Sequence, residues 1–343
     1  MSSKDSAPQG PGARAPNGLL IVSGADVRRA LPMSDCIEVV DRAMRAVSNG
    51  GADVPLRTIM QLPGGRNLFG VMPGYLDDPR GVGAKIITVY PDNTKHGLPS
   101  HLGLVVLFDA QIGFPLAVMD AAEITAIRTA AASAVATRAL ARKDASRLAI
   151  LGTGEQAVTH LEAISKVRTL RSVRIWGRSA ERAEHFAEEQ SPKLSVRVEV
   201  SKTAEDAVRD ADIVCTVTAS HEPVLKGAWL APGAHVNLVG ASRLNAREAD
   251  DDVVARARFF VDSRTSARGE AGELKHAMDA GRVNESHVLG EIGDVLSGTV
   301  VGRTGDDNVT VYKSLGVAAQ DLAAAHVIYE RAVRDGIGTR VPF

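Results

Sequence analysis

Hydrophobic residues follow two different patterns along the chain, and the pattern changes near residue 139. Between Val54 and Met119, short apolar runs such as VGAKIITVY and LGLVVLFD are separated by Gly, Pro and Asp. Apolar runs of this length between turn residues predict short strands in a largely antiparallel sheet. From Ala145 onward, strand-like runs alternate with helical ones, beginning with RLAILG and EQAVTHLEAISKV. This alternation predicts a parallel sheet with helices on both of its faces.

Helices are predicted around both groups of strands. Apolar residues recur at helical spacing between Ile37 and Val47, with Ser34 or Asp35 as the expected cap and Gly50 as the end. The Ala-rich segment 121–142 predicts a long helix because Ala has the highest helix propensity. Two later segments, SARGEAGELKHAMDAG and HVLGEIGDVLSG, predict helices or caps over the second sheet. Residues 308–336 predict a last strand and a long helix.

These patterns predict an α/β protein with two domains. Residues 1–18 are rich in Pro, Gly, Ser and Ala and predict a disordered leader. Residues 19–138 form the first predicted domain and residues 139–315 the second. We expect the C-terminal helix, within 316–343, to return to the first domain.

The composition excludes several classes of function. The 343 residues carry 40 basic and 41 acidic side chains, so no basic excess favours nucleic acid or an anionic membrane. No apolar run reaches the ~18 residues of a membrane span, and the first residues lack the apolar core of a secretory signal. Cys36 and Cys215 lie far apart, and the histidines show no metal-ligand spacing. A cytoplasmic protein that handles small molecules, without a metal, is therefore expected.

The segment LAILGTGEQA, residues 148–157, has the pattern of a phosphate-binding turn between a strand and a helix. Gly152 would permit the tight turn, Gly154 would let a pyrophosphate approach the backbone, and Ala157 would keep helix and strand close together. The helix N-terminus would then offer free N–H donors. Because the pattern lies within a βαβ unit, it predicts a Rossmann-type dinucleotide site in the second domain.

The residues after the next strand bear on the identity of the dinucleotide. The segment RIWGRSAER places Gly177 and Arg178 where an acidic residue would bind the ribose 2′-hydroxyl of NAD. A guanidinium suits a 2′-phosphate instead. The sequence therefore favours NADPH as the cofactor, with NADH as the alternative.

Three basic residues of the first domain lie among apolar or small residues. Arg57 is in PLRTIM, Lys85 in GVGAKIITVY and Arg128 in ITAIRTAAASAVA. A single residue of this kind usually lies at the rim of a fold with its charged end in water. Three of them beside a nucleotide domain favour an anion site, because a buried cation requires an anionic partner. A substrate carboxylate would supply that partner.

Acidic residues outside these motifs have structural interpretations. The run EADDD, Glu248–Asp252, predicts a helix start, where acidic side chains interact favourably with the helix dipole. Asp321 lies near the start of the last helix and is expected to cap that helix or to orient Lys313.

Five segments together resemble the ornithine cyclodeaminase/μ-crystallin family, over nearly the whole chain from about Leu19 onward. They are AKIITVYPDN, PSHLGLVVLFDAQIGFPLAVMDAAEITAIRTAAASAVATRALAR, LAILGTGEQA, VRIWGRS and NVTVYKSLGVAAQDLAAA. The resemblance implies a homodimer. In it, the first domain, joined by the last helix, would bind substrate and form the dimer, and the Rossmann domain would bind the nicotinamide cofactor.

The resemblance also implies roles for individual residues. Arg57, Lys85 and Arg128 would hold the substrate carboxylate, and Leu315 would touch the substrate. Lys85 would also be the catalytic residue that donates a proton or a hydrogen bond. The residues that would line the cofactor come from both domains: Ser100, Gly152, Thr153, Gly154, Glu155, Gln156, Arg178, Thr218, Ser242 and Ser314.

One segment departs from the cyclodeaminases of this family. Their strand corresponding to NLVGAS ends in Gly-Gly-Asp, and that aspartate is the acid/base residue beside the substrate amine. This chain has Gly240-Ala241-Ser242 followed by Arg243. A serine hydroxyl near neutral pH does not replace a carboxylate as a base without its own activator. The segment resembles the reductase and crystallin branch, which reduces cyclic imines that carry a carboxylate.

The resulting hypothesis is an NAD(P)H-dependent ketimine reductase. It would reduce 1-pyrroline-2-carboxylate or 1-piperideine-2-carboxylate to L-proline or L-pipecolate by hydride transfer to the C=N carbon. The alternative enzymes are an ornithine cyclodeaminase, an alanine-dehydrogenase-like enzyme and a 3-hydroxyproline dehydratase. A μ-crystallin-like protein that binds NADPH and a small molecule is a further alternative, but unpaired charges in its pocket would then serve no purpose.

Overall fold

Residues 18–343 are described by the computed structural model, and they contain two eight-stranded sheets. The first sheet has the order β16-β1-β7-β6-β5-β4-β2, with β3 paired to β4. All its strand pairs are antiparallel except β1–β7, as the turn-rich pattern predicted. The strands are β1 (Leu19–Val22), β2 (Ala52–Asp53), β3 (Thr58–Gln61), β4 (Leu68–Leu76), β5 (Gly81–Val89), β6 (His101–Phe108), β7 (Pro115–Asp120) and β16 (Thr339–Val341).

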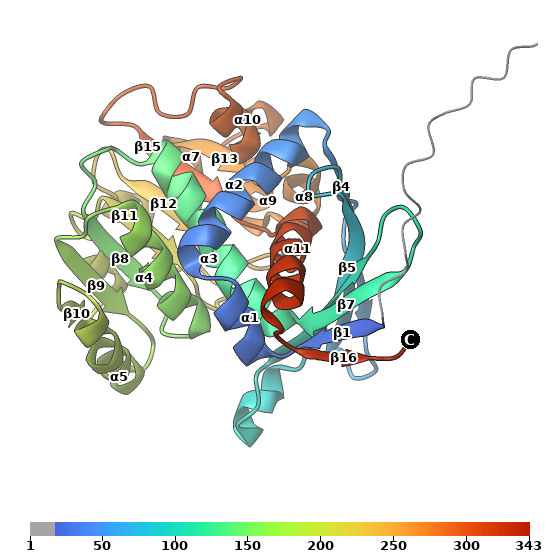
Figure 1. Ribbon diagram of the computed structural model, residues 1–343. Coiled ribbons are helices and arrows are strands. Elements are labelled where there is room, and N and C mark those ends of the chain that lie inside the picture. Colours follow the sequence, from blue (N-terminus) through green and yellow to red (C-terminus); the bar gives the residue numbers. More distant parts are fainter. Residues whose placement is uncertain (1–17) are drawn as a thin grey trace, which may run out of the picture.

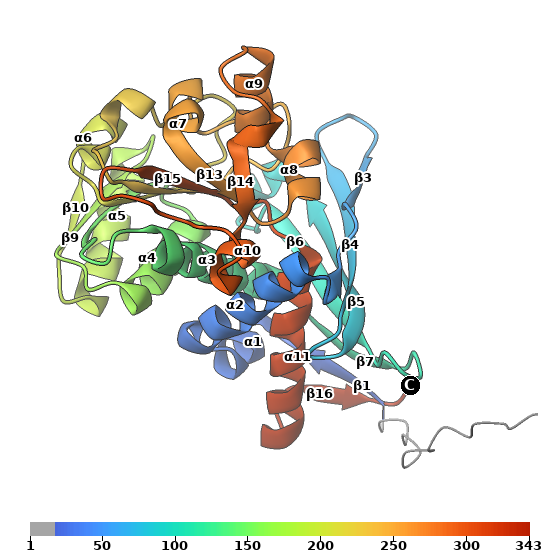
Figure 2. The ribbon, with the colours of Figure 1, turned by 90° about the horizontal axis from the view of Figure 1, so that it is seen from above.

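Helices cover only one face of this first sheet among residues 18–343 (Figures 1 and 2). They are α1 (Gly24–Ala30), α2 (Met33–Asn49), α3 (Ala121–Leu140) and α11 (Ala318–Asp335), with η1 (Pro91–His96) in the loop between β5 and β6. Ser23 caps α1. The predicted cap of α2 was wrong, because this helix begins after Pro32, ahead of Ser34 and Asp35. Proline can precede a helix because the first helical N–H groups need no intrahelical partner.

The second sheet is entirely parallel and has the order β10-β9-β8-β11-β12-β15-β13-β14. Its strands are β8 (Arg147–Leu151), β9 (Ser172–Trp176), β10 (Val198–Val200), β11 (Ile213–Thr216), β12 (His235–Leu238), β13 (Ala257–Val261), β14 (Val288–Glu291) and β15 (Val309–Lys313). From β8 the chain adds strands first on one side and then on the other. The switch between β8 and β11 is where ligands bind in sheets of this kind.

Helices pack on both faces of the second sheet (Figure 2), as the alternation of strands and helices predicted. They are α4 (Glu155–Val167), α5 (Ala180–Gln190), α6 (Ala204–Val208), α7 (Asp251–Arg256), α8 (Arg264–Glu270), α9 (Gly272–Asp279) and α10 (Ile292–Ser297), with short turns η2 (Ser191–Lys193), η3 (Gly227–Trp229) and η4 (Glu285–His287). Strands β11, β12 and β15 are buried along their whole length because both faces are covered.

Strands β14 and β16 were not predicted as strands, and neither was the two-residue β2. Part of HVLGEIGDVLSG forms β14, which pairs in parallel with β13, and α10 follows it. The segment after α11 forms β16, which pairs with β1. Both are edge strands of three or four residues. A segment this short becomes a strand because it pairs with a neighbouring strand, and its own sequence pattern is too short to predict it.

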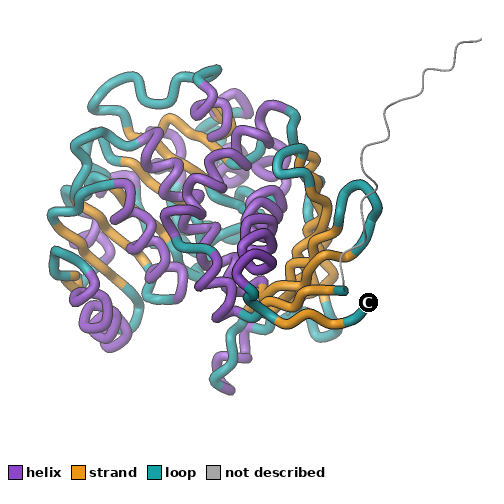
Figure 3. The backbone as a smooth tube through the Cα atoms, in the orientation of Figure 1, coloured by secondary structure: helices purple, strands orange, loops and turns teal. Residues whose placement is uncertain are grey.

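The two sheets are joined through α3 and α11. The Ala-rich helix α3 packs against α4 and against strands of both sheets, and small side chains allow this close approach. Helix α11 returns to the first sheet and contacts α2, β4 and β5, as expected for the C-terminal segment. Helices therefore fill the space between the two sheets (Figure 3). The predicted leader, residues 1–18, lies outside the described residues except for Gly18.

Candidate active site

Lys85 and Arg128 meet at the start of α11 and share one carboxylate. Lys85 Nζ lies 3.1 Å from Asp321 Oδ1, and Arg128 Nε lies 2.9 Å from the same oxygen. All three side chains are buried, with at most 6% of each exposed. Arg128 Nη1 also donates to Gln320 Oε1 at 2.7 Å. A buried cation without a counter-charge is strongly unfavourable, so Asp321 is what allows the two cations to lie together.

The sequence prediction for Asp321 was wrong. It does not orient Lys313, whose Nζ lies 2.9 Å from Glu273. Helix α11 has no side-chain cap, and Asp321 lies in its first turn with its carboxylate directed to Lys85 and Arg128. The sequence did not identify this partner because β5, α3 and α11 meet only in the folded chain.

Arg57 joins the site from the loop before β3 and connects the two domains. Its Nε lies 2.7 Å from Glu270, at the end of α8. Its Nη2 donates to the carbonyl oxygens of Leu315 and Gly316 at 2.7 and 2.8 Å. The structure therefore places Arg57 against the backbone of Leu315, and the roles of both residues toward a substrate stay predictions.

The turn at Gly316 brings α11 up to Arg128. Gly316 has φ +79°, and a Cβ atom there would lie 2.7 Å from Arg128 Nη1. Only glycine suits this backbone and this spacing. The carboxylate of Asp262 accepts hydrogen bonds from the N–H groups of Leu315 and Gly316 and so fixes the turn.

The cluster changes the proton affinity of its own groups. The pKa of Lys85 is lowered to about 7, mainly by burial and next by the charge of Arg128, while Asp321 opposes both effects. Burial alone would raise the pKa of Asp321, but Arg128 and Lys85 hold it below its usual value. Asp321 is therefore a carboxylate near neutral pH, and Lys85 can hold or release a proton there. This is the property of a general acid.

The predicted phosphate turn has the geometry that a dinucleotide requires. Gly152, directly after β8, has φ +124°, and a Cβ atom there would lie 2.6 Å from the carbonyl oxygen of Val217. Gly154 caps α4 without a side chain, and a Cβ on it would meet nothing within 4 Å. Ala157 is fully buried between helix and strand. Free N–H groups at a helix start beside open space fit a pyrophosphate.

The other predicted cofactor residues divide into two groups. Those that follow strands of the parallel sheet meet at one edge: Thr153, Glu155 and Gln156 after β8, Arg178 after β9, Thr218 after β11, Ser242 after β12 and Ser314 after β15. Ser100 instead lies in the first domain, with Oγ 3.0 Å from His101 Nδ1. The roles of these residues toward a cofactor stay predictions.

A chain of contacts links the phosphate turn to the cation cluster. Gln156 Nε2 donates to the carbonyl oxygen of Thr125 at 3.5 Å. The hydroxyl of the same Thr125 accepts from Lys85 Nζ at 3.3 Å. Thr125 therefore connects Gln156 of the phosphate turn with Lys85 of the cation cluster.

Sequence reasoning missed the acidic half of this site. Asp321 and Glu270 pair with the predicted cations, and Glu248 is buried close by at the edge of the second sheet. The prediction for the run EADDD holds only for its aspartates, since Asp250 caps α7 and the next two lie in its first turn. Glu248 precedes that helix. An acidic residue among small or apolar ones, as in GVAAQD, was the available signal for Asp321.

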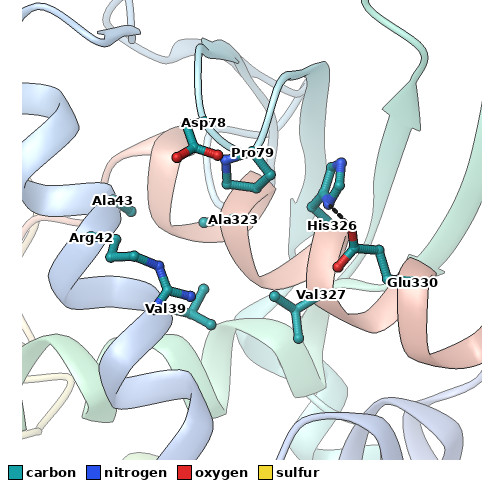
Figure 4. Close-up of a pocket in the computed structure, with 9 residues that line it drawn as sticks. All are labelled: Val39, Arg42, Ala43, Asp78, Pro79, Ala323, His326, Val327 and Glu330. Carbon is teal, nitrogen blue, oxygen red and sulfur yellow. Dashed lines mark ion pairs between the residues drawn. The ribbon is translucent and has the colours of Figure 1, made fainter.

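A separate hollow of about 220 Å³ lies between α2 and α11 (Figure 4). Its polar groups include Arg42, Asp78, His326 and Glu330, and His326 pairs with Glu330 at 3.6 Å. None of the predicted site residues lines it. Residues 18–343 contain no cluster of three His, Cys, Asp or Glu side chains able to hold a metal ion. In the same range, no helix has the length and apolar character to cross a membrane.

Comparisons with known proteins find one family that matches most of the chain. The profile of the ornithine cyclodeaminase/mu-crystallin family matches residues 19–336. A Delta(1)-pyrroline-2-carboxylate reductase of Bacillus cereus is 35% identical over 326 residues, which is 95% of this chain and all of that protein. The ketimine reductase mu-crystallin of Mus musculus is 39% identical over 282 residues, 82% of this chain and 86% of that protein.

Solved structures agree with the fold. The Delta(1)-pyrroline-2-carboxylate reductase of Thermococcus litoralis, in complex with NADH and L-proline, superposes with a TM-score of 0.92 at 38% identity. The match covers 94% of this chain and all of that one. An archaeal alanine dehydrogenase dimer with bound NAD gives a TM-score of 0.89 at 32% identity, over 95% of this chain and 99% of that one.

Proposed function

The chain belongs to the ornithine cyclodeaminase/mu-crystallin family, and we propose that it reduces a cyclic 2-imino acid with NADPH. The substrates are 1-pyrroline-2-carboxylate or 1-piperideine-2-carboxylate, and the products are L-proline or L-pipecolate. The observation that carries this proposal is the buried cluster of Lys85, Arg128 and Asp321 beside a dinucleotide-type turn. As a member of this family, the chain is an NAD(P)-dependent oxidoreductase.

The cations of the site suit a carboxylate ligand. Arg57, Lys85 and Arg128 supply three positive charges when Lys85 is protonated. Three acidic groups face them, namely Glu270, Asp321 and Asp262, which lies close enough to Arg128 to interact with its charge. A guanidinium can hold a carboxylate through two parallel hydrogen bonds. A single carboxylate on the substrate would take this place.

The same residues account for the proton that the reaction needs. When bound, the nicotinamide supplies the hydride for the C=N carbon. Arg57 and Arg128 fix the carboxylate and hence the face and position of the imine. Lys85 delivers a proton toward the imine nitrogen, because its pKa near 7 allows it to lose a proton under working conditions. Asp321 holds Lys85 in place and maintains its charge before the transfer.

The preference for NADPH rests on Arg178. This residue follows β9, is exposed, and comes two residues after Trp176, the last residue of the strand. The position is where a Rossmann domain contacts the adenosine ribose, and a guanidinium there favours a 2′-phosphate. NADH remains the alternative, because the structural relatives contain NADH or NAD.

The uncovered face of the first sheet supports a homodimer. Ile21, Met60, Val82, Leu102 and Leu104 are on this face, and between 37% and 53% of each is exposed. A contiguous apolar surface on a soluble domain marks an interaction site. A second copy of the same face is the partner that the family resemblance implies, and the alanine dehydrogenase neighbour is a dimer.

Cyclodeamination of ornithine is the main alternative. It is disfavoured by Ser242, which follows β12 where the cyclodeaminases carry an aspartate. Reductive amination of a keto acid is a second candidate, because one structural neighbour is an alanine dehydrogenase. Both predict a different substrate for the same cofactor.

The test is a substrate comparison with the purified protein. We expect oxidation of NADPH, and more slowly of NADH, with 1-pyrroline-2-carboxylate, and loss of this activity in Arg128→Ala. Ammonia release from L-ornithine without imine reduction would instead identify a cyclodeaminase. Oxidation that requires ammonia and pyruvate would identify an amino acid dehydrogenase.

A further inference from the structure

Glu248 is a fully buried carboxylate that holds two loops at the carboxyl edge of the second sheet. Its Oε1 accepts from the backbone N–H and the hydroxyl of Thr218, after β11, at 2.6 and 2.7 Å. Its Oε2 accepts from the backbone N–H of Gly240, after β12, at 2.6 Å, and from the hydroxyl of Thr216 at 2.7 Å. Four donors therefore converge on one side chain.

The donors favour the ionised form of Glu248. Backbone N–H groups can only donate, and each carboxylate oxygen accepts one of them. The hydroxyl of Thr218 accepts from the N–H of Ser220 at 3.1 Å, so its own proton is directed to Glu248. Burial raises the pKa of Glu248, whereas the Thr218 hydrogen bonds and the charge of Lys313 oppose this rise.

The surrounding cluster has more negative than positive charge. The backbone N–H of Glu248 donates to Glu273 Oε1 at 3.0 Å, and Glu273 Oε2 lies 2.9 Å from Lys313 Nζ. Lys313 also donates to the carbonyl oxygen of Ala241. Two buried carboxylates therefore face one buried ammonium, which pairs directly with Glu273 and acts on Glu248 only through its charge.

Given the proposed function, this cluster lies behind the nicotinamide half of the predicted cofactor site. Arg178 follows β9 on one side of the phosphate turn, which places the adenosine half there. The other half of a dinucleotide then extends past β11 and β12, where the loops held by Glu248 begin. Oxidation of the cofactor places a positive charge on its nicotinamide ring.

We propose that Glu248 is a positioning residue that holds the two loops of the nicotinamide pocket and favours the oxidised cofactor over the reduced one. A fixed negative charge behind the pocket attracts the positively charged ring and leaves the neutral reduced ring unaffected. Electrostatic interactions of this kind are strong at buried positions, where water does not screen them. The effect favours departure of the hydride from the cofactor.

The test compares the dissociation constants of NADP⁺ and NADPH by isothermal titration calorimetry. In Glu248→Gln the constant for NADP⁺ should rise about three- to tenfold more than that for NADPH. Glu248→Asp keeps the charge, so any weakening there should be equal for both forms. Equal weakening of both forms in Glu248→Gln would overturn the proposal and leave Glu248 a structural residue.

Two further results keep the test decisive. If Glu248→Gln does not fold, judged by circular dichroism, Glu273→Gln removes a negative charge from the same cluster and should shift the same ratio in the same direction. An unchanged ratio there would overturn the proposal. If the wild-type protein binds neither NADP(H) nor NAD(H), the proposed function fails together with this inference. Normal binding with an unchanged ratio contradicts this inference alone.

Discussion

Asp321 determines how Lys85 and Arg128 can lie side by side in a buried site. Removing Lys85 from water lowers its pKa, and the neighbouring guanidinium lowers it further. The carboxylate of Asp321, 3.1 Å from Nζ, is the main group that opposes this fall. The proton affinity of Lys85 near neutral pH is therefore the result of two large opposing effects.

This balance predicts the pH dependence of imine reduction. The active form carries the proton on Lys85, so kcat/KM should fall as the pH rises through about 7. In Asp321→Asn the opposing charge is lost, the pKa of Lys85 falls, and the decline should move to lower pH by about one unit or more. Asp335→Asn, an exposed carboxylate on the same helix, is the control and should leave the profile in place. An unmoved decline in Asp321→Asn would separate Lys85 from the proton step.

Sequence reasoning found the basic residues of the site but not their acidic partners. Arg57, Lys85 and Arg128 could be recognised because a charged residue in an apolar run is conspicuous. Glu248 could not, because it lies in an acidic run that also begins a helix. Its contacts with Thr218 and Gly240 join segments that are 30 and 8 residues apart, and only the folded sheet brings them together.

At the level of elements, the turn from β8 into α4 was the most predictable feature of the chain. Its glycines have local physical reasons, namely a positive φ at Gly152 and an uncapped helix start at Gly154. Strands β14 and β16 were missed because a strand of three or four residues depends on its neighbour in the sheet. Local conformational rules therefore predicted the cofactor turn, whereas strand pairing at the sheet edges required the structure.

A substitution at Gly154 should weaken cofactor binding without unfolding the protein. Gly154 has φ −92°, and an added Cβ would meet nothing within 4 Å, so Gly154→Ala should cost the fold about 1 kcal/mol or less. The methyl group would occupy the space that a pyrophosphate needs, so the Kd for NADPH should rise at least about tenfold.

Thermal unfolding and calorimetric titration measure the two effects separately. Gly152→Ala is the comparison, because its positive φ and the contact with Val217 should destabilise the fold as well as weaken binding. Normal NADPH affinity in Gly154→Ala would mean that the turn does not hold the pyrophosphate.

For the whole molecule, the main open surface is the outer face of the first sheet. One face of this sheet packs against α11 and its neighbours (Figure 2). The other face exposes apolar side chains. Side chains alternate between the two faces along β5 and β6. Lys85 and Val105 therefore face the helices, whereas Val82 and Leu104 face outward. The same strands therefore supply the site on one side and the proposed dimer contact on the other.

A single charge on the outer face should disrupt the dimer. Leu104 is 48% exposed in the single chain, and Leu104→Lys would place an unpaired ammonium in the buried interface. Light scattering coupled to gel filtration should show a dimer for the wild type and a monomer for this variant. Val301→Lys, at a 64% exposed residue of the second domain, should remain dimeric. A wild-type monomer, or a dimeric Leu104→Lys, would place the contact elsewhere or remove it.

We expect the site between the two sheets to transfer hydride to the carbon of a carboxylate-bearing imine. The most direct measurement follows deuterium from NADPH, labelled at the transferred position, into the product formed from 1-pyrroline-2-carboxylate. The expected product is L-proline with deuterium on its α-carbon, with no such product from Arg128→Ala. Proline without the label, or proline formed from L-ornithine with release of ammonia and no consumption of NADPH, would rule out imine reduction at this site.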